Sequence, residues 1–298
     1  MPSSLPRSDR TAVRGRPSPG RRSDGNSGTG ARVAVAGADE LFVRLPADDP
    51  TLFGLDLDEL ARHWASAASG GPIAAETMTG ADRRAQALGV PGISLMEHAG
   101  TAVAAVAHAV AVAKERWNKG PILVLCGSGN NGGDGLVAAR WLAGLGAQIV
   151  VVLVSSGPRP GTPDAARNWD RLAGLDGVTR MHASGPREIA LLERGIERAA
   201  LAVDALLGTG VHGQLREPIR SAVALVRHAR AAGVPVVAVD TPTALDLTSG
   251  EPSDPVVHAD ATVTFHRPKV GLLTRSGRAL AGRTFVAPIG IPPEADRG

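Results

Sequence analysis

The sequence predicts an α/β protein with a Rossmann-like fold: a doubly wound, mostly parallel sheet with helices on both faces, in other words an α-β-α sandwich. Two observations support this prediction. From residue 121 onward, short apolar runs alternate with longer stretches that have helical periodicity, and such alternation produces right-handed β-α-β units. The first of these runs leads directly into a glycine-rich loop and then a helix. With 298 residues, 43% of them apolar, the chain can bury a large core.

Residues 1–47 are rich in Arg, Pro, Gly and Ser and lack apolar periodicity, so we expect a disordered tail. Residues 48–70 are expected to form an amphipathic helix and linker, because Asp56 and Glu59 have capping-box spacing ahead of apolar residues at helical intervals. Residues 71–298 are expected to form the main domain. Residues 1–32 hold seven arginines and two aspartates, a charge of +5, which leaves −2 of the total of +3 for the remainder. We therefore expect the folded part to bind no nucleic acid.

The elements of the main domain follow from the pattern of apolar residues. Helices are expected at 76–88 and 96–117, then near 135–146, 164–174, 187–199 and 216–232. Strands are expected at 121–126, 148–154, 178–182, 201–206, 234–239, 261–265 and 284–287. No run of 18 consecutive apolar residues occurs, so we expect no membrane insertion. The single cysteine, Cys126, is expected to be a buried strand residue in a protein of the reducing cytoplasm.

The loop from Gly127 to Gly135 has G-x-G-x-x-G spacing, which lets the backbone approach a pyrophosphate. Asn130, Asn131 and Asp134 add oxygen acceptors, which suit an alkali or alkaline-earth cation or a sugar hydroxyl. A dehydrogenase would carry an acidic residue after the second strand to hold the ribose. This chain continues there with Ser155–Ser156–Gly157 instead, which argues against a dehydrogenase.

Asp204 and Asp240 each follow a predicted buried strand, so they are expected at the carboxyl edge of the sheet, where open α/β proteins bind ligands. An isolated aspartate at such a position is more often a turn former or a helix cap. Two aspartates beside the glycine-rich segment Gly208–Gln214 favour a binding site.

Five ordered segments make the chain resemble the YjeF N-terminal domain family, whose enzymes are NAD(P)H-hydrate epimerases. These segments are LMEHAG at 95–100, GSGNNGGDG at 127–135, VDALLGTG at 203–210, VDTPTALD at 239–246 and ATVTFHRPKVGLLT at 261–274.

The resemblance implies an isomerase that interconverts the R and S epimers of NADHX or NADPHX, the hydrated forms of NADH and NADPH. It implies Asp240 as the catalytic residue and K⁺ bound by Asn131, Asp204 and Thr243. It implies a nucleotide-binding set made of Asn130, Asn131, Gly132, Gly133, Asp134, Gly208, Thr209, Gly210, Val211, His212, Gly213, Gln214 and Asp240. A homodimer and a separate NAD(P)HX dehydratase as pathway partner are further expectations, while the choice between NADHX and NADPHX and the role of the tail stay open.

One departure from the family concerns Thr243–Ala244, which stand where relatives have Ser-Gly. We expect a negative φ at Ala244 and a preserved cation site. Lys269 matches a family lysine, but a solvated lysine at a strand end is an equally good interpretation. The alternative function is a non-catalytic nucleotide-binding or scaffold protein of the same fold, and retention of Asn131, Asp204 and Asp240 together argues for the enzyme.

Overall fold

The structure, a computed structural model, describes residues 44–209 and 214–297. Phe42–Gly298 form one compact unit, and Met1–Leu41 are a separate unit that lies outside the described residues, as does nearly all of the predicted tail. Residues 48–70, predicted as a helix and linker, belong to the compact unit.

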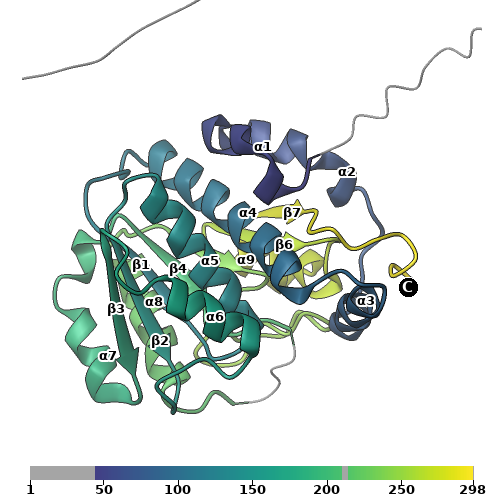
Figure 1. The fold of residues 1–298 in the computed structure, drawn as a ribbon. Coiled ribbons are helices and arrows are strands. Elements are labelled where there is room, and N and C mark those ends of the chain that lie inside the picture. Colours follow the sequence, from purple (N-terminus) through teal and green to yellow (C-terminus); the bar gives the residue numbers. More distant parts are fainter. Residues whose placement is uncertain (1–43, 210–213, 298) are drawn as a thin grey trace, which may run out of the picture. The chain divides into compact units, whose positions relative to one another are not determined.

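The core of this unit is a seven-stranded sheet with the order β3-β2-β1-β4-β5-β6-β7, in which every neighbouring pair is parallel (Figure 1). The strands are β1 (Ile122–Cys126), β2 (Ile149–Val154), β3 (Val178–Ala183), β4 (Leu201–Ala205), β5 (Val236–Val239), β6 (Ala261–Phe265) and β7 (Arg283–Ala287). All seven predicted strands and the predicted fold class are confirmed.

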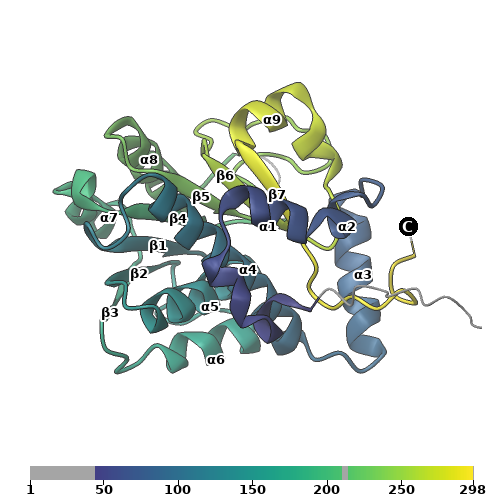
Figure 2. The same ribbon diagram turned by 90° about the horizontal axis from the view of Figure 1, so that it is seen from above.

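Successive side chains of each strand enter two different cores, as the pleat of a strand requires. In β1, Ile122 and Val124 face the core under α4 (Gly92–Ala113) and α5 (Asn130–Gly144). Leu123 and Leu125 face the core under α7 (Pro186–Glu193) and α8 (Ile219–Ala231). The two views agree that α5 and α6 (Pro163–Arg171) cover one face and α8 the other (Figures 1 and 2).

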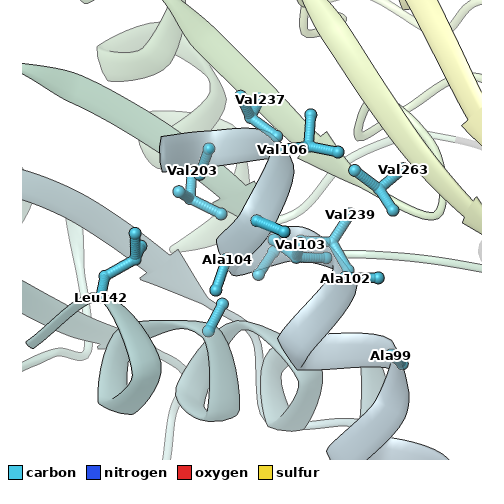
Figure 3. Packing of buried hydrophobic residues seen from close by; sticks show 14 of the residues in the cluster. Ala99, Ala102, Val103, Ala104, Val106, Leu142, Val203, Val237, Val239 and Val263 are labelled. Atoms are coloured by element: carbon cyan, nitrogen blue, oxygen red, sulfur yellow. The ribbon is translucent and has the colours of Figure 1, made fainter. Parts of the chain in front are cut away.

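Helix α4 crosses the middle of the sheet and is buried along most of its length. Small and β-branched side chains of α4 pack near valines of β4, β5 and β6 (Figure 3). The residues of α4 are Ala99, Ala102, Val103 and Val106, and the valines of the strands are Val203, Val237, Val239 and Val263. By length and composition alone α4 could cross a membrane, but 78% of its most apolar window is buried in the protein, as in a core helix. The predicted end at residue 117 is wrong, because Glu115 and Asn118 adopt positive φ values of 55° and 59° that a helix cannot contain.

The N-terminal elements pack on this core. Two short 3₁₀ helices (Pro46–Asp48 and Pro50–Gly54) precede α1 (Leu57–His63), α2 (Ala65–Ala68) and α3 (Ala75–Ala87). The predicted capping box is present, with Asp56 Oδ1 accepting from Glu59 N and Glu59 Oε2 accepting from Asp56 N, both at 2.8 Å. Leu60 and Trp64 are buried in the core cluster, so this segment docks on its own domain.

Two further helical segments differ from the prediction. The helix expected at 187–199 ends at Glu193, because Gly195 has a φ of 85°, and a short 3₁₀ helix (Ile196–Arg198) follows. Between β6 and β7 the chain forms a 3₁₀ helix (Val270–Leu273) and α9 (Arg275–Ala281), which the periodicity did not indicate. The hydroxyl of Thr274 accepts from Gly277 N at 3.0 Å and caps α9.

The glycine-rich loop is shorter than predicted, because α5 begins at Asn130 rather than near residue 135. Glycine has a low helix propensity, and for that reason the sequence favoured a loop. The structure shows that these glycines are needed for close packing: a Cβ at Gly133 would lie 2.5 Å from the methyl carbon of Met96, and one at Gly135 2.5 Å from the Ala205 Cβ.

Candidate active site

The proposed site residues gather at the carboxyl ends of β1, β4, β5 and β6, which are neighbours in the middle of the sheet. The strand order changes direction between β1 and β4, and open α/β proteins bind ligands at this topological switch point. The loop after β1 leads into α5, and Asp204 and Asp240 stand at the ends of β4 and β5. The predicted location of both aspartates is therefore confirmed.

The N-terminus of α5 opens onto this edge. Gly129 is the N-cap residue and no side chain caps the helix, so the first backbone N–H groups and the positive end of the helix dipole are available to an anion. Asn131 lies against the loop after β4, since a Cβ on Gly208 would come within 2.8 Å of Asn131 Oδ1. The Asn131 Nδ2 atom is buried and has no hydrogen-bond partner among the described residues.

Asp134, one turn into α5, is also buried. Burial is the main cause that raises the pKa of this carboxyl well above its ordinary value, and the negative charge of Asp240 raises it further. The charge of Asp240, which comes from a different element, thus disfavours the ionised form of Asp134.

Asp204 and Thr243 form a tightly bonded pair. Thr243 donates to Asp204 through its backbone N at 2.8 Å and through its hydroxyl at 2.6 Å. Burial raises the pKa of Asp204 to about 6, although the hydrogen bonds from Thr243 and Leu206 act in the opposite direction. Leu207 N donates to the Thr243 hydroxyl at 3.1 Å, which ties the loop after β4 to the loop after β5.

Asp240 occupies a strained turn at the end of β5. Its φ is 61°, and Thr241 N donates to Val239 O at 2.7 Å, which closes a three-residue turn around it. Positive-φ turns of this kind are rare and often mark functional sites. The Asp240 Oδ1 atom accepts from the Thr264 hydroxyl at 2.9 Å and lies 3.4 Å from Lys269 Nζ.

Lys269 is fully buried, so a solvated lysine at a strand end is the wrong interpretation. Sequence reasoning also missed Thr264, which is one of several Thr and Val residues that alternate in a strand and carries no signal of its own. Only the packing of β6 against β5 brings this hydroxyl to Asp240.

The expected negative φ at Ala244 is wrong, because the structure has a φ of 79° there. Ala244 is the third residue of a turn closed by Leu245 N and Pro242 O at 3.0 Å, and type II turns require a positive φ at this position. The alanine Cβ therefore stands in a conformation that favours glycine.

Ala244→Gly is expected to raise the free energy of unfolding by up to about 1 kcal/mol, because it removes the steric cost of a Cβ at positive φ. Ala232→Gly is the matched control: Ala232 is exposed at the end of α8 with a φ of −81°, so glycine there should lower stability by roughly 0.5–1 kcal/mol. Urea titration of the three proteins measures both effects. Equal losses in the two variants would contradict the strain at Ala244.

The remaining predicted binding residues are only partly placed. Gly210, Val211, His212 and Gly213 lie outside the described residues. Asn130 and Gln214 are exposed, and Gly208 and Thr209 are half-buried. The binding role of the whole set stays a prediction.

The residues expected to bind K⁺ fit such an ion in their chemistry. Asn131, Asp204 and Thr243 supply oxygen atoms only, and the contacts through Gly208 and Leu207 bring all three to one place. A half-turn of the Asn131 amide would put its oxygen where the unpartnered Nδ2 now lies. Thr243 keeps capacity for a ligand mainly at its backbone carbonyl, which accepts one bond from Val257 N at 3.0 Å, since its hydroxyl is committed to Asp204.

Comparisons with known proteins agree with this architecture. The family model described as "YjeF-related protein N-terminus" matches residues 92–271, more than half of the chain. The chain therefore belongs to the YjeF N-terminal family, as its motifs indicated.

Two relatives and one solved structure illustrate the similarity. The bifunctional NAD(P)H-hydrate repair enzyme Nnr of Pyrobaculum aerophilum is 44% identical over 217 residues, which are 72% of this chain and 41% of that protein. The NAD(P)H-hydrate epimerase of Cenarchaeum symbiosum is 37% identical over 227 residues, 76% of this chain and 98% of that protein. The crystal structure of yeast ynu0 matches with a TM-score of 0.57 at 26% identity, covering 68% of this chain and 83% of that one. The chain spans only about two fifths of the length of the bifunctional relatives.

Proposed function

We propose that this protein is an NAD(P)H-hydrate epimerase that interconverts the R and S epimers of NADHX and NADPHX. The observation that carries the proposal is the position of Asp240 at the carboxyl end of β5, one strand away from the switch point, where its charge acts on Asp134 in the first turns of the uncapped helix α5. The helix end suits the pyrophosphate, and the carboxylate suits proton transfer. The names of relatives that match most of this chain support the same activity.

The proposed chemistry needs one group that exchanges protons. In the substrate the hydroxyl-bearing carbon is bonded to the ring nitrogen, so protonation of the hydroxyl lets it leave as water and gives an iminium ion. Water then adds from the opposite face and returns one proton. In this proposal Asp240 gives the first proton and takes the second, so the enzyme is unchanged after each cycle. Proton transfer by a placed group contributes roughly 10² to 10⁴ in rate.

The proposal is tested by incubating purified R-NADHX with the protein and following S-NADHX by chromatography, with a protein-free sample to measure spontaneous conversion. The expected result is a much faster approach to the same epimer mixture. A rate equal to that of the protein-free sample would contradict the proposal and would favour a non-catalytic binding role.

K⁺ is proposed as the bound cation, held by Asn131, Asp204 and Thr243. When bound, it would offset the charge of the buried Asp204 carboxylate and fix the loops after β4 and β5 against α5. A homodimer and a separate dehydratase that acts on the same hydrates are part of the same proposal and rest on the family resemblance. A cytoplasmic location is also proposed and rests on the single cysteine, Cys126.

Replacing Na⁺ by K⁺ is expected to raise the epimerase rate and the melting temperature of the wild-type protein, because both effects require an ordered cation site. Asp204→Ala should lose the K⁺ response in both measurements. Asp254→Ala is the control, since the Asp254 side chain is 95% exposed and removing it leaves no buried charge without a partner. If wild type ignores K⁺ and Asp204→Ala retains full activity, the cation site does not exist in this protein.

A further inference from the structure

Lys269 is the unusual residue of this site. It is the only lysine of the chain that is buried, and it has no exposed surface at all. Its ammonium nitrogen lies 2.9 Å from Thr264 Oγ1, 2.8 Å from Phe265 O, 3.2 Å from Arg267 O and 3.4 Å from Asp240 Oδ1. Burial lowers the pKa of this lysine, and the carboxylate of Asp240 acts in the opposite direction.

The choice of lysine at this position is informative, because the chain otherwise avoids lysine. Of its 32 lysines and arginines only three are lysines, and the other two, Lys114 and Lys119, are exposed. An ammonium group is compact and directs three N–H donors, whereas a guanidinium is planar and larger. A small enclosed space with oxygen atoms on several sides requires the ammonium group.

The backbone around Lys269 is shaped to supply these oxygens. His266 has a φ of 66°, and Arg267 N donates to Phe265 O at 2.7 Å. This three-residue turn at the end of β6 lies beside the similar turn around Asp240 at the end of β5, and it directs the Phe265 and Arg267 carbonyls to the ammonium group. Two adjacent turns with positive φ values, at Asp240 and His266, thus support the contact between Lys269 and Asp240.

The two oxygens of Asp240 are not equivalent. Oδ1 accepts a hydrogen bond from Thr264, which itself accepts from Lys269, and Oδ1 also faces the ammonium group directly. No donor among the described residues reaches Oδ2, and the side chain keeps 10% of its surface exposed. The free oxygen is therefore the one that a substrate can meet.

We propose that Lys269 and Thr264 are positioning residues that hold Oδ1 of Asp240, so that Oδ2 is presented to the substrate hydroxyl as the oxygen that exchanges protons. This inference rests on the proposed epimerase function and deepens it. Lys269 itself stays anchored to its carbonyl partners and exchanges no proton with the substrate.

A buried ion pair could instead serve stability alone, since such pairs occur without a catalytic role. The two roles differ in what they change. A structural pair alters the melting temperature but leaves the kcat of the folded enzyme unchanged. A positioning pair alters kcat and leaves KM nearly constant, because most of the proposed nucleotide contacts come from α5 and from the loop after β4.

The test compares two isosteric variants of one strand. Thr264→Val removes the hydroxyl that tethers Oδ1, and Thr262→Val removes a hydroxyl that is equally buried but donates to Ala281 O at 2.8 Å. Thr264→Val is expected to lower kcat about tenfold or more with KM changed less than about threefold, because the hydrogen bond that orients Oδ1 is lost. Thr262→Val should keep the wild-type kcat.

Lys269→Met removes the charge at similar side-chain length. The expected result is a kcat lowered at least tenfold with KM changed less than about threefold, since the ammonium group no longer holds Thr264 and Oδ1 in place. If Lys269→Met does not fold, the pair of threonine variants decides alone.

The outcomes separate this inference from the proposed function. A wild-type protein without epimerase activity would overturn the function. An active wild type, together with Thr264→Val and a folded Lys269→Met that keep the wild-type kcat and KM, would overturn the positioning role while the function stands.

Discussion

Asp240→Asn is expected to fold and to lose about 10²- to 10⁴-fold in kcat, because the amide is nearly isosteric but cannot exchange a proton. The Asn oxygen can still accept from the Thr264 hydroxyl, so the strained turn at the end of β5 keeps its hydrogen bond. The variant also removes the only carboxylate that lies within 4.0 Å of Lys269 in the described part of the chain. A lower melting temperature is therefore expected along with the loss of activity.

The measurement is the initial rate of epimer conversion at saturating substrate, with circular dichroism to confirm the fold. Asp254→Asn, which changes an exposed carboxylate in the same manner, is expected to match wild type. If Asp240→Asn kept more than about a tenth of the wild-type kcat, the acid and base role of this carboxylate would be wrong.

Gly132→Ala is expected to lower the free energy of unfolding by roughly 1–3 kcal/mol or more and to abolish nucleotide binding. A Cβ on Gly132 would collide with the backbone carbonyl of Gly127 and would stand 3.0 Å from the Gly127 nitrogen. No side chain can rotate to relieve this contact, so the loop between β1 and α5 must move. Movement of that loop displaces the backbone N–H groups that are proposed to bind the pyrophosphate.

Gly144→Ala in the same helix is the matched control. A Cβ on Gly144 meets no atom within 4 Å, so alanine should stabilise the helix by up to about 1 kcal/mol. Thermal unfolding and equilibrium binding of NADPH, used as a stable analogue of the hydrate, measure both variants. Similar melting temperatures and affinities for the two variants would show that the close approach at Gly132 affects neither stability nor nucleotide binding.

The strands could be predicted from the sequence because each is short, apolar and bounded by turn residues. The middle strands of a parallel sheet are buried on both faces, and β1, β4, β5 and β6 are buried at every position. The ends of these strands could therefore be predicted from the sequence, and so could the positions of Asp204 and Asp240 at the carboxyl edge of the sheet.

The start of α5 and the conformation of Ala244 could not be predicted for a shared reason. In both places local propensity and tertiary packing disagree. Asn and Gly disfavour a helix interior, yet α5 includes Asn130 to Gly135 because its first turns approach β4 and α4 closely. Alanine disfavours positive φ, yet the turn after β5 imposes it.

Lys269 illustrates a different limit. A lysine after a strand is usually solvated, and nothing in its neighbours along the chain indicates burial. Its environment is built by Thr264, by carbonyls at the end of β6 and by Asp240 from another strand. Residues that act together here are brought together only by the order of strands in the sheet.

The central placement of the site has a consequence for protein engineering. No proposed site residue in the described part of the chain comes from β2, β3 or β7 or from the segments that follow them, and the outer strands β3 and β7 are the ones with exposed positions. The segment between α6 and β3 and the surface of α7 can therefore accept affinity tags, fluorophores or fused partners at a distance from the reacting groups. A label attached there is expected to leave substrate binding unchanged.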